Sequence, residues 1–123
     1  MIRILLVDDE AWFRTPAAIM LRQGGYHVDC ATSGEEALKL LESIHPDLIL
    51  LDLVMEGMGG LSFLRRIRAD ERFAAMSVIV LSAVSDGQPG TEAMALGAKA
   101  CLVKGNFSLL DLTHHVELAA RVA

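Results

Sequence analysis

Short apolar runs alternate with segments of helical periodicity along the whole chain. The runs are rich in leucine, isoleucine and valine, which is typical of β-strands. The segments between them place apolar residues three or four positions apart, which is typical of amphipathic helices. We expect strands at residues 2–8, 26–31, 47–52, 77–81 and 99–103. We expect helices at residues 11–22, 34–43, 60–69, 89–96 and 108–121.

Capping residues mark the start of two of these helices. Ser33, with Glu36 three positions later, has the spacing of a capping box, in which each residue satisfies a free backbone N–H of the first turn. Ser108 and Asp111 repeat this spacing before the last helix. Pro16 lies about six residues into the first predicted helix, so we expect it to kink that helix or to delay its start.

The alternation of elements predicts the fold class. The first, third and fourth strands are apolar nearly throughout, which favours a parallel sheet covered by helices on both faces. Five strand–helix units in succession indicate a doubly wound α/β sandwich. Because no linker, repeat or low-complexity tract interrupts residues 1–123, we expect a single domain.

Composition narrows the classes of protein that fit. The 123-residue chain is 53% hydrophobic with a mean hydropathy of +0.42, which excludes a disordered chain. Its apolar runs are strand-sized and its start lacks a secretory signal, so we expect a cytoplasmic protein without a membrane span. The net charge is −5 and the basic residues are scattered apart from 65–68, which argues against nucleic-acid binding by this domain.

The two cysteines do not form a recognisable metal or redox motif. Cys30 and Cys101 fall in separate predicted strands, with no CxxC pair and no cluster of cysteine and histidine. We therefore expect two buried thiols and neither a zinc site nor a disulfide.

Polar side chains collect where the predicted strands end. These residues are Asp8, Asp9, Glu10, Asp52, Ser82 and Lys104. Each has an ordinary explanation by itself: Asp8 or Asp9 as a helix cap, Ser82 as a turn residue, and Lys104 as a solvated strand end. In a doubly wound sheet, however, the carboxyl ends of the strands form the ligand-binding edge. Together these residues therefore indicate a site.

The residue types at this edge suggest phosphoryl chemistry. Several close carboxylates repel one another unless a cation intervenes, and Lys104 with a divalent ion would supply it. Magnesium fits, because it binds through one or two carboxylates together with waters and phosphate oxygens. A carboxylate could then serve as the nucleophile and form an acyl phosphate. The chain contains neither GxxxxGK[ST] nor GxGxxG, so the phosphoryl group would come from another molecule.

Four segments in order resemble the receiver domain of two-component response regulators, including the chemotaxis regulator. They are ILLVDDE, HPDLILLDLVMEGMGGL, VIVLSA and GAKACLVK, and the resemblance covers essentially the whole chain. It implies a flavodoxin-like fold with five parallel strands and five helices. The expected strand order is 2-1-3-4-5, which is that of the chemotaxis regulator.

The resemblance also implies a role for each site residue. Asp52 would accept a phosphoryl group from a phosphohistidine of a histidine kinase or phosphotransfer protein. Ser82 and Lys104 would contact the phosphoryl group. The Mg²⁺ ligands would be Asp9, Asp52 and the backbone carbonyl of Val54, with Asp8 assisting through water. Such a protein is a signalling switch that catalyses only its own phosphorylation and dephosphorylation.

Three positions depart from the family pattern. Glu56 stands four residues after Asp52, where the family usually has a proline. Gly105 follows the lysine where the family has a proline joined by a cis bond, so we expect a trans bond or an altered loop. Cys101 takes the place of the aromatic residue that commonly relays phosphorylation. Because a cysteine is small, we expect the relay to run through shifts of the backbone.

The last predicted helix has two apolar stripes. Leu109, Leu112, Val116 and Ala119 form one stripe, which we expect to face the sheet. Leu110, His114 and Leu118 form a separate outer ridge. Receiver domains commonly signal through this part of the fold, so the ridge is a candidate contact for an effector or a second copy of the chain. Trp12, close behind the acidic residues, should lie near the site.

Two other functions compete with the receiver. A phosphatase that uses an aspartyl phosphate commonly carries a second aspartate two residues after the nucleophile, and Val54 at that position argues against it. A binding module that keeps the fold but signals without phosphate has support only from Cys101 and Gly105.

Overall fold

The sheet has the predicted topology. The computed structural model describes residues 2–55, 57–82, 88–105 and 107–121. Five parallel strands lie in the order β2-β1-β3-β4-β5. They are β1 (Arg3–Val7), β2 (His27–Ala31), β3 (Leu48–Asp52), β4 (Ser77–Ser82) and β5 (Ala100–Val103). The strand positions and the order 2-1-3-4-5 expected from the sequence are confirmed.

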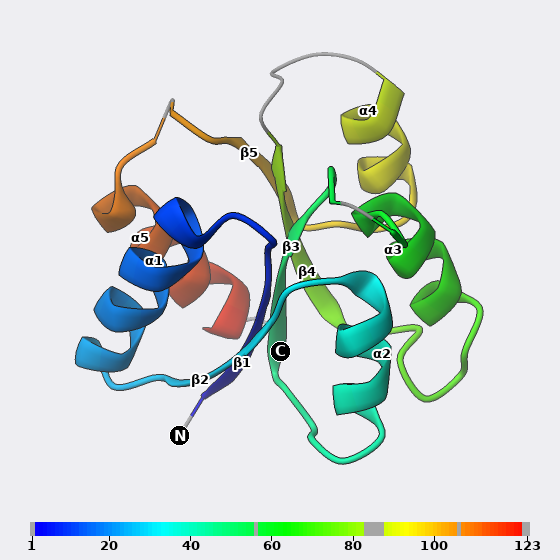
Figure 1. Cartoon of the computed structure of the whole chain (residues 1–123), viewed down its shortest axis with the longest axis horizontal. Coiled ribbons are helices and arrows are strands. Elements are labelled where there is room, and N and C mark those ends of the chain that lie inside the picture. Colours follow the sequence, from blue (N-terminus) through cyan, green and yellow to red (C-terminus); the bar gives the residue numbers. More distant parts are fainter. Residues whose placement is uncertain (1, 56, 83–87, 106, 122–123) are drawn as a thin grey trace.

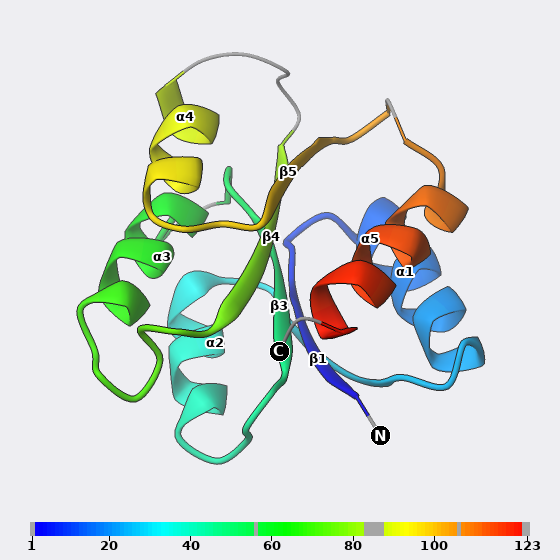
Figure 2. The same ribbon diagram turned by 180° about the vertical axis from the view of Figure 1, so that it is seen from behind.

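Helices cover both faces of the sheet. They are α1 (Ala11–Gln23), α2 (Gly34–Leu41), α3 (Gly60–Arg68), α4 (Gln88–Ala95) and α5 (Leu109–Arg121). Figure 1 shows α1 and α5 on one side and α2, α3 and α4 on the other, and Figure 2 shows the same layers from behind. This is the expected doubly wound, flavodoxin-like α/β sandwich. None of the described helices is both long and apolar enough to cross a membrane.

The alternation of side chains along the inner strands builds two cores. Leu5 and Val7 of β1 belong to the core beneath α2, α3 and α4, whereas Ile4 and Leu6 belong to the core beneath α1 and α5. Every residue of β3 and β4 is buried. Strands that are apolar on both faces are expected in a parallel sheet with two helical layers, and here they hold the strand ends in fixed positions.

Both predicted capping residues act at helix starts. The Glu36 N–H donates to Ser33 Oγ over 3.1 Å, while the Glu36 carboxylate accepts from the N–H of Thr32 over 2.6 Å. At α5 the pair is fully reciprocal. The Asp111 N–H donates to Ser108 Oγ over 3.1 Å, and the Ser108 N–H donates to Asp111 Oδ2 over 3.0 Å.

Pro16 does not delay α1, and that part of the prediction is wrong. The helix already begins at Ala11, because the carbonyl of Glu10 accepts from the N–H groups of Phe13 and Arg14 over 3.1 and 2.9 Å. The first turn is therefore complete before the proline. Pro16 lies inside the helix on its exposed side.

The cysteines lie in strands as expected, but they are only partly buried. Cys30 belongs to β2 and Cys101 to β5, the two edge strands of the sheet. Edge strands are covered less completely than central ones, which explains why the expectation of two buried thiols was wrong. Both cysteines are free, and burial raises the pKa of each thiol.

Arg68 forms hydrogen bonds at the end of the sheet where β4 and β5 begin. Its guanidinium, at the end of α3, donates to the backbone carbonyls of Met76 and Leu96 over 2.7 Å each and to that of Ala74 over 3.1 Å. A guanidinium carries five N–H donors in a fixed plane, so one side chain can satisfy several carbonyls from separate segments. Arg68 thereby joins the end of α3 to the segments that enter β4 and β5.

We predict that Arg68→Lys destabilises the protein. An ammonium has three donors and cannot reproduce the planar arrangement, so the free energy of unfolding should fall by about 2 kcal/mol. Urea denaturation followed by circular dichroism measures this change. Arg66→Lys, at an exposed position of the same helix, is the control and should change stability by less than about 0.5 kcal/mol. Equal stability of the two variants would contradict the role of Arg68.

Candidate functional site

The register of the sheet brings the predicted site residues to one edge. Val7 pairs with Leu51, so Asp8 and Asp52 each stand one position further along neighbouring strands. The Lys104 N–H donates to the carbonyl of Ser82 over 2.7 Å, which places Lys104 beyond the ends of β4 and β5. The edge predicted from the sequence is therefore present.

Lys104 is a buried cation surrounded by carboxylates. Its Nζ lies 2.7 Å from Asp8 Oδ2, 2.8 Å from Glu10 Oε1 and 3.4 Å from Asp52 Oδ2. The exposed fractions of the side chains are 2% for Lys104, 0% for Asp8 and 3% for Asp52. Buried charges persist only when they are paired, so these groups depend on one another.

Backbone groups orient the two buried aspartates. Asp8 Oδ1 accepts from the N–H of Glu10 over 2.8 Å, and Asp52 Oδ1 accepts from the N–H of Val54 over 3.2 Å. Each carboxylate thus commits one oxygen to the backbone and turns the other, Oδ2, toward Lys104. Among the described residues neither Oδ2 accepts a hydrogen bond of normal geometry, so both meet the ammonium only as opposite charges.

Burial shifts the ionisation of this group. Two effects raise the pKa of Asp52 to about 6: the larger is removal from water, and the smaller is the negative charge of Asp8. The positive charge of Lys104 acts in the opposite direction. Burial also disfavours the charged form of Lys104. The carboxylates that contact it, those of Asp8, Glu10 and Asp52, outweigh that effect and raise the pKa of Lys104. The site therefore has more negative charge than its one lysine neutralises.

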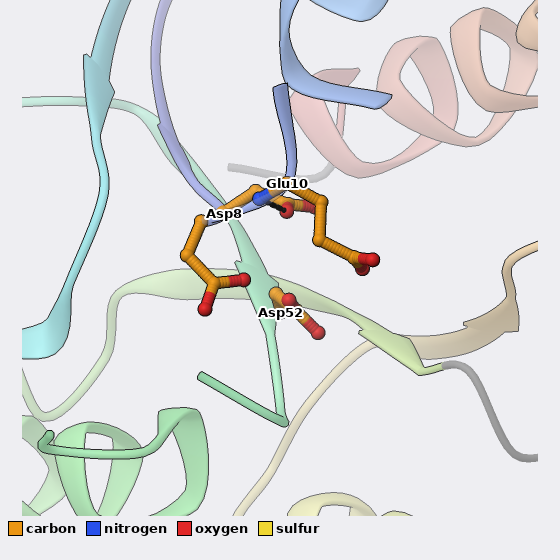
Figure 3. Close-up of side chains that lie close together, drawn as sticks. Asp8, Glu10 and Asp52 are labelled. Atoms are coloured by element: carbon orange, nitrogen blue, oxygen red, sulfur yellow. Dashed lines mark hydrogen bonds between the residues drawn. The ribbon is translucent and has the colours of Figure 1, made fainter. Parts of the chain in front are cut away.

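The acidic residues fit a hard divalent cation. Asp8, Asp9, Glu10 and Asp52 each offer a carboxylate oxygen, and these oxygens lie within 4.8 Å of one another. Figure 3 shows the side chains of Asp8, Glu10 and Asp52 gathered where β1 and β3 end. All of these potential metal ligands are oxygen atoms, which suits Mg²⁺. Two of them, Asp8 Oδ2 and Asp52 Oδ2, are buried without a well-aligned hydrogen-bond donor.

Glu10, which the sequence places at this edge without a specific role, bonds two neighbours in the site. Its carboxylate accepts from Lys104 Nζ over 2.8 Å and from Trp12 Nε1 over 2.9 Å, and these bonds lower the pKa of Glu10. The expected position of Trp12 near the site is thereby confirmed.

The remaining predicted residues lie around this centre. Ser82 ends β4 and is buried, one position past the residue that pairs with Asp52. Asp9 belongs to the acidic group, and the side chain of Val54 is exposed. The bond between Lys104 and Gly105 is trans, as expected, and Gly105 has a φ of +91°. That conformation suits glycine and is closed to proline.

Cys101 lies behind the site, in β5. It packs against the core on the α4 side of the sheet, and a Cβ added to Gly90 of α4 would lie 3.5 Å from its sulfur. The position expected for a relay residue therefore holds a small side chain between β5 and α4.

The two stripes of α5 are arranged as expected. Leu112, Val116 and Ala119 are buried against the sheet, and Leu109 packs beside them. On the outer ridge, 76% of Leu110 and 49% of Leu118 are exposed, and His114 is exposed as well.

We predict that Asp52→Asn removes a pH-dependent loss of stability in the metal-free protein. The raised pKa means that folding favours protonated Asp52, so wild-type stability falls as the pH rises from about 4 through 6. At neutral pH the variant should be more stable by on the order of 2 kcal/mol. Urea denaturation in the presence of a chelator, at about pH 4 and pH 7, measures the difference. Equal pH dependence in the two proteins would contradict the prediction.

Comparison with known proteins is consistent with this geometry. The model of the response regulator receiver domain matches residues 4–117. The regulatory protein AtoC of Escherichia coli is 33% identical over 98% of this chain, and the transcriptional regulatory protein PdtaR of Mycobacterium tuberculosis is 40% identical over 95%. The matched part is 25% of AtoC and 56% of PdtaR, so the chain spans only part of these relatives.

Solved structures give the same result. The chemotaxis response regulator CheY4 of Vibrio cholerae is 28% identical, with a TM-score of 0.88 over 97% of this chain and 98% of that one. The response regulator TrrA of Thermotoga maritima, solved in complex with Mg²⁺ and BeF, is 35% identical, with a TM-score of 0.83 over 97% and 99%. The fold, the acidic edge and these matches agree, and the chain belongs to the response regulator receiver domain family of two-component signalling.

Proposed function

We propose that residues 1–123 act as a single receiver domain in which Asp52 takes a phosphoryl group from a phosphohistidine. The donor would be a histidine kinase or a phosphotransfer protein. The observation that carries this proposal is the buried Asp52 carboxylate, which has one oxygen fixed by the backbone and the other 3.4 Å from a buried ammonium. A nucleophile held in this way needs little reorganisation before it reacts.

The transfer would be a single displacement at phosphorus. Asp52 Oδ2 attacks the phosphorus atom, an O–P bond forms, and the P–N bond to the donor imidazole breaks with its electron pair moving to that nitrogen. Lys104 would pair with a phosphoryl oxygen, and the Ser82 hydroxyl would donate to another. The product is an acyl phosphate on Asp52 and a free histidine on the donor.

Mg²⁺ would be held by the acidic group. We assign it to Asp9, Asp52 and the backbone carbonyl of Val54, with Asp8 assisting through water. When bound, the ion neutralises negative charge on the transferring group and orients it. The excess of carboxylates over cations at this edge supports the assignment.

The readout would lie on the outer ridge of α5. Leu110, His114 and Leu118 project outward from a helix whose other side is fixed to the sheet, and we infer that they contact an effector or a second copy of the chain. Leu110 and Leu118 each lie about one helical turn from His114, on opposite sides of it. Both are large, exposed aliphatic side chains, which suits an apolar contact with a partner. The domain would thus be a switch and would turn over no separate substrate.

We predict that acetyl phosphate adds one phosphoryl group to the wild-type protein only when Mg²⁺ is present. Intact-mass spectrometry detects the adduct. Asp52→Asn should show none, and Asp70→Asn, at a remote position between α3 and β4, should behave as wild type. An adduct that persists in Asp52→Asn would contradict the assignment of the acceptor. If neither acetyl phosphate nor a phosphorylated kinase modifies the wild type, the phosphate-independent binding module is the better explanation.

We predict that the ridge mediates self-association of the activated domain. With Mg²⁺ and beryllium fluoride, which mimics a phosphoryl group, wild type should sediment as a dimer. The double variant Leu110→Ser with Leu118→Ser should sediment as a monomer. Ile19→Ser, which changes an exposed aliphatic side chain on α1, is the control and should still dimerise. A wild type that remains monomeric would exclude the second copy and leave an effector as the partner.

A further inference from the structure

We propose that Glu10 is a positioning residue that holds the Lys104 ammonium in the resting site and releases it when Asp52 is phosphorylated. Glu10, Trp12 and Lys104 together form what we call the latch. This inference rests on the proposed role of Asp52, and it concerns how the lysine becomes available to the acyl phosphate.

In the resting site Lys104 is held toward β1. Its Nζ lies 2.7 Å from Asp8 Oδ2 and 2.8 Å from Glu10 Oε1, and only the 2.8 Å contact has normal hydrogen-bond geometry. The contact to Asp52 is longer, at 3.4 Å. In the resting site the ammonium is thus closer to Glu10 than to Asp52, and closer pairing with a group on Asp52 would draw it away from Glu10.

Glu10 is the carboxylate of this group that can move away. Asp8 and Asp52 are buried, and a backbone N–H fixes one oxygen of each. The side chain of Glu10 is 42% exposed, so its carboxylate can turn into water at little cost. Its backbone stays in place, because its N–H donates to Asp8 and its carbonyl accepts the first bonds of α1.

Trp12 holds Glu10 in the engaged position. The indole Nε1–H donates to Glu10 Oε2 over 2.9 Å while Lys104 donates to Oε1, so each carboxylate oxygen has its own donor. Trp12 is 62% exposed, and its ring makes a T-shaped contact with that of Phe13. Trp12 is the only tryptophan in the chain, so its indole reports the state of the latch without interference.

Phosphorylation shifts the competition for Lys104. A phosphoryl group on Asp52 carries more negative charge than the carboxylate it replaces, and it forms beside a buried ammonium, where charges are weakly screened. Glu10 offers one charge that water already solvates in part. Lys104 therefore moves to the acyl phosphate, and Glu10 and Trp12 lose their shared partner. The latch lowers the benefit that the acyl phosphate obtains from the lysine.

The test follows the indole N–H resonance of Trp12 in ¹⁵N-labelled protein. In resting wild type this resonance should differ from that in Glu10→Gln, which weakens the acceptor. Addition of Mg²⁺ with beryllium fluoride should move the wild-type resonance toward the variant position and leave the variant nearly unchanged. Glu71→Gln, at an exposed residue remote from the site, is the matched control and should follow wild type.

Kinetics supply a second readout. Glu10→Gln should be phosphorylated by acetyl phosphate about threefold faster than wild type, because a partly exposed ion pair of modest strength no longer retains the lysine. Trp12→Phe keeps an aromatic ring and removes the donor, so it should change the rate in the same direction by a smaller factor. A rate in Glu10→Gln equal to or below that of wild type would overturn the inference, and a severe loss would place Glu10 among the metal ligands.

The outcomes separate this inference from the proposed function. If backbone amides around Asp52 respond to beryllium fluoride but the Trp12 indole does not, the latch is wrong and the phosphoacceptor role stands. If acetyl phosphate leaves no adduct and no amide responds, the proposed function fails, and the release of Lys104 fails with it.

Discussion

The functional edge of this domain depends on one buried ammonium among carboxylates. Lys104 offsets part of the charge of Asp8 and Asp52, which lie buried at the ends of β1 and β3. Without that cation the two acids would repel each other in a poorly screened environment. The site thus keeps an excess of negative charge. This excess contributes to the raised pKa of Asp52 and makes the edge suitable for a divalent ion. It is also consistent with the two carboxylate oxygens that lack a well-aligned hydrogen-bond donor.

The rigid scaffold and the adjustable parts of the site are built differently. The aspartates are fixed by backbone N–H groups and by the inner strands, so the Asp52 carboxylate is held in one position. Glu10 and Trp12 stand at the solvent side of the same group and are partly exposed. A switch needs both kinds of residue: fixed groups make the chemistry accurate, and a few weakly held groups allow the site to change state.

The fold and most of the site could be predicted from the sequence, because both depend on local patterns. Continuous apolar strands imply a covered parallel sheet, and the strand ends then collect Asp8, Asp52 and Lys104 regardless of side-chain detail. The role of Glu10 could not be predicted, since it depends on the rotamer with which Glu10 meets Lys104, which is 94 positions away in the chain. The start of α1 and the burial of Cys30 were misjudged, because a helix can begin ahead of a proline and an edge strand is covered less than a central one.

The two ends of the sheet have different roles: Arg68 stabilises one end, and the acidic site lies at the other. Arg68 binds backbone carbonyls where β4 and β5 begin, whereas the carboxylates lie at the opposite end of the sheet, where β1 and β3 end. Electrostatic strain at one edge is thus offset by hydrogen bonds at the other, and the two sets of residues do not overlap. Substitutions at the acidic edge can therefore change the properties of the site during evolution. The hydrogen bonds at the opposite edge compensate for the loss of folding stability that such substitutions cause.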